Sequence, residues 1–356
     1  MSAVPPLDDL TPGTGTDPER LATDIVVDDL EADNEADIAG PIEPTGIEGR
    51  TPWQLAKARL YRDKITMFIL GVVALAVLAA ILAPILTAFG VLKPNEFHQD
   101  LINTKLGGYP LGKWGGISWS HPLGVEPQTG RDVLSRLMLG ISFSLLVAIF
   151  ATLVAAVIGT VLGLIAGYAG GRVDRWVSRI VDMTLSFPQT LMLLALSAQA
   201  MILITKAGVP EGNPTRALYI ILVLGFFAWP YFARIIRGQV LSLREREFVE
   251  AARSLGANRR RIYFRELLPN LWAPILVYST MMMPSNISAE AALSYLGVGI
   301  NPPTPTLGNI LTNSVNFAPT VPTYFIIPGL AIATLVLSFN LLGDGLRDAL
   351  DPKADR

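Results

Sequence analysis

The sequence predicts an all-α protein that crosses a membrane several times. Three observations lead to this prediction: 51% of the 356 residues are apolar, only 16% are charged, and six separate stretches are long and apolar enough to span a bilayer. A hydrocarbon core about 30 Å thick needs roughly 20 apolar helical residues, whereas soluble domains carry about a quarter charged residues. A soluble globular fold and a single membrane anchor are therefore both excluded.

Residues 1–50 differ in composition from the rest of the chain. They hold 13 acidic and two basic residues and lack any long apolar run. Such a segment buries too little surface to offset its chain entropy, and it has neither the basic start nor the apolar core of a secretory signal. We expect a disordered acidic cytoplasmic tail, either simply solvated or used for docking or regulation. Residues 51–64 form a basic segment before the first span.

Six transmembrane helices are expected. The first covers residues 65–89, and the other five fall within a membrane core at 140–346, as residues 143–168, 183–205, 218–236, 273–296 and 324–342. Several stretches contain or adjoin a proline. Proline is tolerated in a span when neighbouring helices satisfy the freed carbonyl groups, so the spans are predicted to pack as one bundle.

The basic residues predict that both ends of the chain lie in the cytoplasm. With the N-terminus inside, 20 of the lysines and arginines near the spans, counted from Arg50 on, fall on cytoplasmic segments and seven on outer segments, as the positive-inside rule requires. Residues 90–139 are then extracytoplasmic and end in a short helix over 131–139. A long loop at 237–271 and the C-terminal segment 347–356 are cytoplasmic. Long structured loops usually carry function.

Glycine recurs every four residues along the second span. Gly159, Gly163, Gly167 and Gly171 form one stripe without side chains on a helix. Such a stripe favours close approach of another helix, and a pore-lining role is the alternative.

The cytoplasmic loop contains two predicted helices. The first includes Glu250, Ala251 and Ala252, and Gly256 ends it because glycine readily adopts the left-handed conformation of a C-cap. The second is amphipathic and stops at Pro269. Alanines give the first helix a slim face suited to a groove on another protein; the alternative is an interfacial helix whose arginines meet anionic headgroups. The loop also contains Ser254, Leu255, Ala257, Arg259, Arg260 and Leu268.

This loop resembles the EAA loop of ABC importer permeases. Further stretches resemble the C-type permeases of dipeptide and oligopeptide importers (DppC/OppC-like): His-Pro-Leu-Gly at 121–124, Gly-Arg-Asp-Val-Leu-Ser-Arg at 130–136, Leu-Ser-Tyr-Leu-Gly-Val-Gly at 293–299, and Leu-Leu-Gly-Asp-Gly-Leu-Arg-Asp-Ala-Leu-Asp-Pro at 341–352. The resemblance covers about residues 51–352. It departs at Val125-Glu126, where this group commonly has Thr-Asp.

The resemblance implies a type I ABC importer permease fold in the bacterial plasma membrane. It also implies four kinds of partner: a second homologous permease, two ABC ATPase subunits or domains, an extracytoplasmic substrate-binding protein, and membrane lipid. The helix of Glu250 would seat in a cleft of the ATPase, with Arg259 and Arg260 against acidic ATPase surface or lipid phosphate. No cofactor is expected on this chain, because ATP and Mg²⁺ would bind the ATPases. The cargo implied is a dipeptide or oligopeptide.

Polar residues within the spans are further candidates. Glu290 and Asn286 lie one helical turn apart in the fifth span. Ionisable groups are expensive in a membrane, so they either line a pathway or make hydrogen bonds between helices. Outside the membrane, Arg131 and Asp132 are expected to meet the binding protein or to roof the cavity.

Enzymatic chemistry is not expected. The sequence has no cysteine, two histidines and no Gly-x-x-x-x-Gly-Lys-[Ser/Thr] phosphate loop, and its net charge of −2 gives no indication of a nucleic-acid partner. Three alternatives stay open: the same machinery with a nickel chelate, glutathione or haem as cargo, an ion-coupled secondary transporter, and a scaffold that binds through its acidic tail.

Overall fold

The computed structural model describes residues 52–350, so the predicted acidic tail at 1–50 lies outside the described residues. Helices α2 (Pro52–Arg62) and α3 (Lys64–Ala88) come first, followed by an outer segment and by α4 (Val133–Ala169), α5 (Gly171–Leu185), α6 (Gln189–Lys206) and α7 (Asn213–Leu243). The second half contains α8 (Glu247–Ser254), α9 (Arg259–Arg261), α10 (Trp272–Tyr295), α11 (Leu307–Val315) and α12 (Pro322–Leu350).

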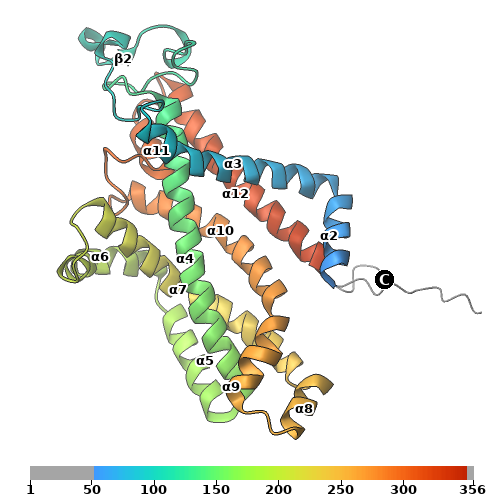
Figure 1. Cartoon of the computed structure of the whole chain (residues 1–356). Coiled ribbons are helices and arrows are strands. Elements are labelled where there is room, and N and C mark those ends of the chain that lie inside the picture. Colours follow the sequence, from blue (N-terminus) through green and yellow to red (C-terminus); the bar gives the residue numbers. More distant parts are fainter. Residues whose placement is uncertain (1–51, 351–356) are drawn as a thin grey trace, which may run out of the picture. The chain divides into compact units, whose positions relative to one another are not determined.

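Helix α4 is the axis of this bundle and runs the length of Figure 1, from the outer segment with β2 to the end that carries α5, α8 and α9. Its 37 residues make it about 55 Å long, well beyond the hydrocarbon core. The separate short helix predicted over residues 131–139 is wrong. Asp132 caps α4 by accepting a hydrogen bond from the amide of Ser135, so the predicted helix is the first part of this long one.

Glycines of α4 allow α7 to lie directly against it. A Cβ atom on Gly159 would lie 2.5 Å from the Cβ of Phe232, one on Gly163 would lie 2.7 Å from the carbonyl oxygen of Ala233, and one on Gly167 would meet Val240 at 2.8 Å. Including Gly171 in this stripe is wrong. Helix α4 ends at Ala169, and Gly171 has a φ of +54° with nothing within 4 Å of its Cβ position, because the chain turns there into α5.

Replacing Gly163 with alanine is expected to lower the free energy of unfolding by about 1–3 kcal/mol, because the added methyl group overpacks the α4–α7 contact. Thermal unfolding of the purified protein in detergent measures this. Gly238→Ala on α7 is the matched control, since its Cβ position is open and alanine favours the helix. Equal stability of the two variants would show that the contact is looser than described.

The predicted third span at residues 183–205 is two helices. Helix α5 ends at Leu185, and Pro188 is the N-cap of α6. Proline lacks an amide hydrogen and disfavours the helical conformation in the residue before it, so the chain breaks at Ser186-Phe187-Pro188. Because the residues on both sides of the break are apolar, the sequence suggested one continuous span.

Five of the described helices are long and apolar enough to cross a membrane: α3, α4, α6, α7 and α12. The predicted fifth span corresponds to α10, which has 24 residues but carries Asn286, Glu290 and several serines. These polar side chains lower its hydropathy, and its neighbours α4 and α12 bury much of them. Six spans therefore stay a prediction.

The core forms where α3, α4, α10 and α12 meet. Ala148 of α4, Ile287 of α10 and Leu335 of α12 belong to one buried cluster, and Val73 of α3 joins it. The outer face of α3 is largely exposed, with Phe68 and Leu75 exposed by 70% and 67%. An apolar exposed face of this kind fits a lipid environment or a neighbouring subunit.

The outer segment between α3 and α4 is a compact loop region with little regular structure. A two-stranded antiparallel sheet pairs Ile102 of β1 (Ile102–Asn103) with Pro110 of β2 (Tyr109–Pro110). Its base contacts the outer ends of α4, α11 and α12 through a cluster of Val133, Ile310, Val321 and Tyr324. It lies at one end of the bundle in Figure 1, and the extracytoplasmic placement of residues 90–139 stays a prediction.

Candidate functional site

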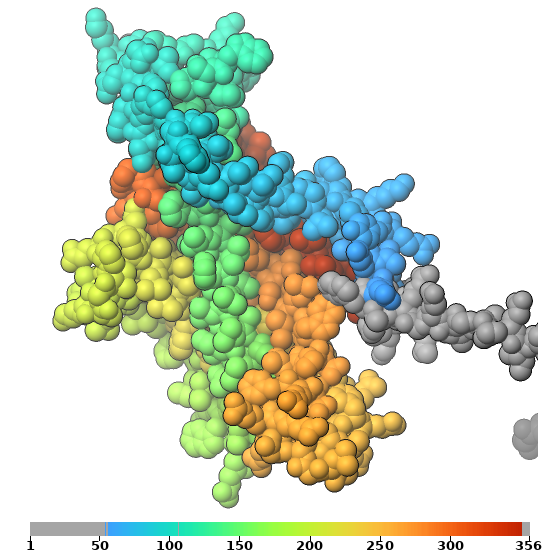
Figure 2. Space-filling view, in the orientation of Figure 1, coloured from blue at the N-terminus to red at the C-terminus, as the bar shows by residue number. Residues whose placement is uncertain are grey.

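The loop that follows α7, predicted to be cytoplasmic, folds as a knob at the end of the bundle opposite the outer segment. Figure 2 shows this knob, in orange, as a lobe beside the ends of α4 and α5. Helix α8 is attached by the buried side chain of Val249, which belongs to a cluster with Phe232 and Ile236 of α7 and with Ile262 and Leu267. The helix is therefore held firmly on one side and free on the other.

The sequence contains signals for both ends of helix α8. Glu247 and Glu250 lie in its first turn, where negative charge favours the helix dipole. At its end Gly256 has a φ of +78°, as predicted for the C-cap region, and the amide of Ala257 donates to the carbonyl of Ala252 at 3.0 Å. Asn258 then caps α9 by accepting from the amide of Arg261 at 2.8 Å, a role the sequence reasoning missed although asparagine is a common N-cap.

The free face of this loop carries most of the predicted coupling residues. Leu255 directly follows α8 and is 87% exposed. Ala252, Ala257 and Leu268 are half-buried. The exposed members are Glu250, Ala251, Ser254, Gly256, Arg259, Arg260 and Pro269.

Aromatic contacts tie α8 to the end of α4, and sequence reasoning missed them. The guanidinium of Arg253 lies 5.8 Å from the ring centroid of Tyr168, and Tyr168 meets the ring of Tyr263 edge-on at 5.2 Å. The Nη1 of Arg244 donates to the carbonyl of Gly167 at 3.2 Å. A displacement of α8 would therefore move the end of α4 as well.

Glu290 and Asn286 both lie inside the helix bundle, as part of the contacts between α10 and its neighbours. Glu290 is fully buried and accepts hydrogen bonds from Ser144 of α4 at 2.8 Å and from Ser294 at 2.9 Å. Ser144 also accepts from the amide of Leu307, the first residue of α11. Asn286 donates to Thr152 of α4 at 2.8 Å. The bonds to Ser144 and Thr152 join helices of one chain. Of the two roles considered for Glu290 and Asn286, they correspond to hydrogen bonding between helices.

Replacing Glu290 with leucine is expected to lower the free energy of unfolding by about 1–3 kcal/mol, because it leaves the Ser144 and Ser294 hydroxyl groups buried without their acceptor. Glu290→Gln keeps an acceptor oxygen and should lose less. Thermal unfolding in detergent measures both, with Ser288→Leu on an exposed position of α10 as control. A leucine variant as stable as the glutamine variant would contradict a structural role.

The outer residues Arg131 and Asp132 are buried and make contacts within the chain. Arg131 donates to Glu126 at 2.5 Å, and Asp132 accepts from the Nδ1 of His121 at 3.0 Å while capping α4. Only 7% of Arg131 and 8% of Asp132 is exposed. These side chains are thus occupied by internal contacts and are not presented to a partner.

Glu126 is the centre of a buried charged cluster that the sequence did not predict. Besides Arg131, it accepts from the hydroxyl of Tyr324 on α12 at 2.5 Å and lies 3.6 Å from the Nε of Arg136 on α4. Burial alone would raise the pKa of Glu126, but the guanidinium groups of Arg136 and Arg131 and the Tyr324 hydroxyl outweigh it and hold the pKa below its ordinary value. The cluster joins the outer segment to α4 and α12.

Two ion pairs fasten α5 to α7. Asp174 accepts two hydrogen bonds from Arg237, and Asp182 accepts from the Nη2 of Arg234 at 2.6 Å. In both pairs the arginine comes from the neighbouring helix α7. Among residues 52–350 there is no group of three or more His, Cys, Asp or Glu side chains that could hold a metal ion.

The chain is a bundle of long apolar helices with an amphipathic loop at one end, and comparisons with known proteins show which class of membrane protein it is. A family model described as "Binding-protein-dependent transport system inner membrane component" matches residues 159–356. A second, described as "N-terminal TM domain of oligopeptide transport permease C", matches residues 51–105.

Individual relatives match over most of their length. The dipeptide transport system permease protein DppC of Alkalihalophilus pseudofirmus is 38% identical over 303 residues, which cover 85% of this chain and 90% of that protein. The glutathione transport system permease protein GsiD of Salmonella paratyphi A is 38% identical over 304 residues, covering 85% and 91%. Among solved structures, an inward-facing form of the MetNI methionine ABC transporter matches with a TM-score of 0.49 and 20% identity, over 61% of this chain and 96% of that chain.

The chain belongs to the inner membrane components of binding-protein-dependent transport systems, as a DppC/OppC-like ABC importer permease. It is a multi-pass inner membrane protein. The family and the helical fold class predicted from the sequence are thereby confirmed.

Proposed function

We propose that this chain is one of two different permease subunits of an ATP-driven importer for short peptides. Two ABC ATPase subunits or domains bind on its cytoplasmic side and a substrate-binding protein on its outer side. ATP and Mg²⁺ bind the ATPases, and this chain holds no cofactor. The observation that carries the proposal is the knob around α8, which presents an exposed apolar tip at Leu255 while Val249 anchors it to the bundle.

The exposed face of α8 suits insertion into a cleft of the ATPase. Ala251 has the smallest side chain that still favours a helix, so the partner's backbone can approach closely there. Glu250 is exposed and can pair with a basic ATPase residue, and Arg259 and Arg260 can meet acidic surface. Burial of an exposed leucine such as Leu255 in a pocket of the partner would contribute about 2 kcal/mol to the binding free energy.

Movement of the ATPases then reaches the spans through packed contacts. ATP binding brings the ATPases together, their clefts carry α8, and the Arg253–Tyr168 contact and the cluster of Val249 carry the ends of α4 and α7. Rigid elements with a bistable interface transmit motion of this kind. The cavity switches from inward-facing to outward-facing, and hydrolysis of ATP resets it.

A short peptide is the cargo that the relatives favour. Their names include dipeptide and glutathione transport, and glutathione is itself a tripeptide. Both ligands carry an amine, carboxylates and amide groups, so one pathway of modest polarity could pass either. The binding protein is expected to set the choice between them.

Purification of the chain from its native membrane tests the proposal. We expect a second permease, ATPase subunits and a binding protein to co-purify, and ATP hydrolysis to rise when the binding protein carries its peptide. Uptake into proteoliposomes, with dipeptide, longer peptide and glutathione as competitors, then identifies the cargo. Recovery of the chain alone, with uptake driven by an ion gradient, would overturn the proposal in favour of a secondary transporter. Loss of partners on deletion of residues 1–50 would indicate a scaffold.

A further inference from the structure

Helix α5 has two faces of different chemistry. One face packs on the bundle: Val181 belongs to a buried cluster with Trp229 and Ala233 of α7, and Asp174 and Asp182 pair with the arginines of α7. All of the acidic residues of α5 are therefore used on this face. The opposite face has no such partner from α7.

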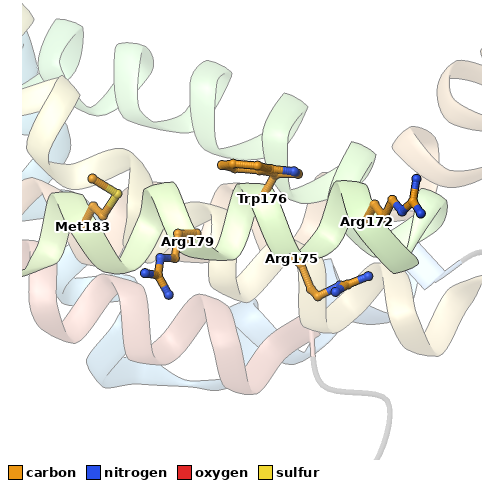
Figure 3. Close-up of a pocket in the computed structure, with 5 residues that line it drawn as sticks. All are labelled: Arg172, Arg175, Trp176, Arg179 and Met183. Carbon is orange, nitrogen blue, oxygen red and sulfur yellow. The ribbon is translucent and has the colours of Figure 1, made fainter.

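That opposite face is basic and apolar together. Arg172, Arg175 and Arg179 are exposed, and with Trp176 and Met183 they line a groove of about 580 Å³ on this single helix. Figure 3 shows the five side chains, with Arg172 near one end of the helix and Met183 toward the other. Within residues 52–350 none of the three arginines forms a salt bridge with an acidic side chain; the Nε of Arg175 donates to the carbonyl of Gly171 at 3.4 Å.

Exposed apolar side chains lie among the arginines and extend beyond them along the helix. The arginines occupy positions 172, 175 and 179, whereas Met183 and Phe187 follow and are exposed by 58% and 53%. From residue 172 to 183 the helix rises about 16 Å. Charge therefore lies at the end of the bundle that carries α8, and exposed apolar surface lies toward its middle and continues on α6 with Leu191, 60% exposed.

This order matches a phospholipid of the cytoplasmic leaflet. We propose that the exposed face of α5 binds an anionic phospholipid, with Arg172, Arg175 and Arg179 on its phosphate, Trp176 at the level of its headgroup, and Met183 against the start of its acyl chains. Arginine binds phosphate with two parallel hydrogen bonds, and tryptophan favours the level of the headgroups. An acidic protein surface would complement the arginines but not the exposed apolar residues between and beyond them. This inference does not depend on the cargo or on the ATPase.

Retained lipid tests the site directly. The chain is purified with its partner subunits from a nanodisc of equal phosphatidylglycerol and phosphatidylcholine, and bound lipid is counted by native mass spectrometry. The triple variant Arg172→Gln, Arg175→Gln, Arg179→Gln is expected to lower the ratio of retained phosphatidylglycerol to phosphatidylcholine by about tenfold or more. Lys105→Gln, Lys113→Gln, Lys206→Gln removes the same charge from exposed outer positions and should leave the ratio unchanged.

An equal loss in both triple variants, or no loss in the first, would overturn the proposal. Complete displacement of phosphatidylglycerol by inorganic phosphate would overturn the assignment to a lipid, because the acyl chains would then contribute nothing.

Single cysteines give a second measurement that does not rely on the arginines. The chain has no cysteine, so Met183→Cys and Trp176→Cys each place one spin label, with the unsubstituted complex as background. We expect a label at 183 to collide with oxygen, which partitions into the acyl region, more often than with a water-soluble nickel chelate. Preference for the nickel chelate would overturn the proposal, as would protection from both together with cross-linking to a partner protein.

Discussion

Replacing Ala251 with tryptophan is expected to lower ATP-dependent uptake by about tenfold or more, while the bundle stays folded. Ala251 is exposed on α8, so the larger side chain clashes only with a protein seated there. Overpacking a fitted contact costs roughly 1–3 kcal/mol, and 1.4 kcal/mol is a factor of ten. Uptake into proteoliposomes and co-purification of the ATPase measure the effect. The neighbouring Ala252→Trp should act in the same direction, but Ala252 is half-buried and the change also strains α8 itself.

Serine at position 251 is the matched control, because it keeps the slim face of α8. The Ala251→Ser variant should retain uptake and ATPase binding, and both variants at position 251 should unfold at the same temperature as the unsubstituted protein. Normal uptake and ATPase co-purification in Ala251→Trp would contradict the assignment of α8 as the coupling helix.

Much of the fold follows from the sequence because apolar runs of about 20 residues dictate helices in a membrane. The ends of helices were harder to predict. Gly171 continues the four-residue spacing of Gly159, Gly163 and Gly167, but spacing does not show where a helix stops, and the chain turns at Gly170. Pro188 lacks an amide hydrogen and so favours a break in the helix. The apolar residues on both sides nevertheless suggest one continuous span.

The cytoplasmic loop was more predictable than the outer contacts because its signals are local. Gly256 and Pro269 lie within the segment that they shape. In contrast, Glu126 meets Tyr324 almost 200 residues away, and Asp182 meets Arg234 on another helix. A single sequence gives no distance between such residues. Arg131 and Asp132 contact Glu126 and His121 of the same outer segment, but a single sequence does not show which of these side chains pair, and the loss of the expected docking surface follows from that pairing.

Replacing Glu126 with leucine is expected to lower the free energy of unfolding by about 3–5 kcal/mol, because Arg131 and Arg136 would stay buried without their counter-charge. Glu126→Gln keeps acceptors for Tyr324 and should be milder.

The lowered pKa of Glu126 also sets a pH dependence of the stability. A carboxylate whose folded pKa lies below its unfolded value of roughly 4.3 contributes stability above that value and loses it as the pH falls through the folded pKa. Thermal unfolding in detergent between about pH 3 and pH 7 should therefore show a loss below about pH 4 in the unsubstituted protein that is smaller in Glu126→Gln. Glu96→Gln, at an exposed pair with Lys93 in the same outer segment, is the control and should leave the stability nearly unchanged, because solvent screens an exposed ion pair. A Glu126→Leu variant no less stable than this control would mean that water or another group already compensates the two arginines.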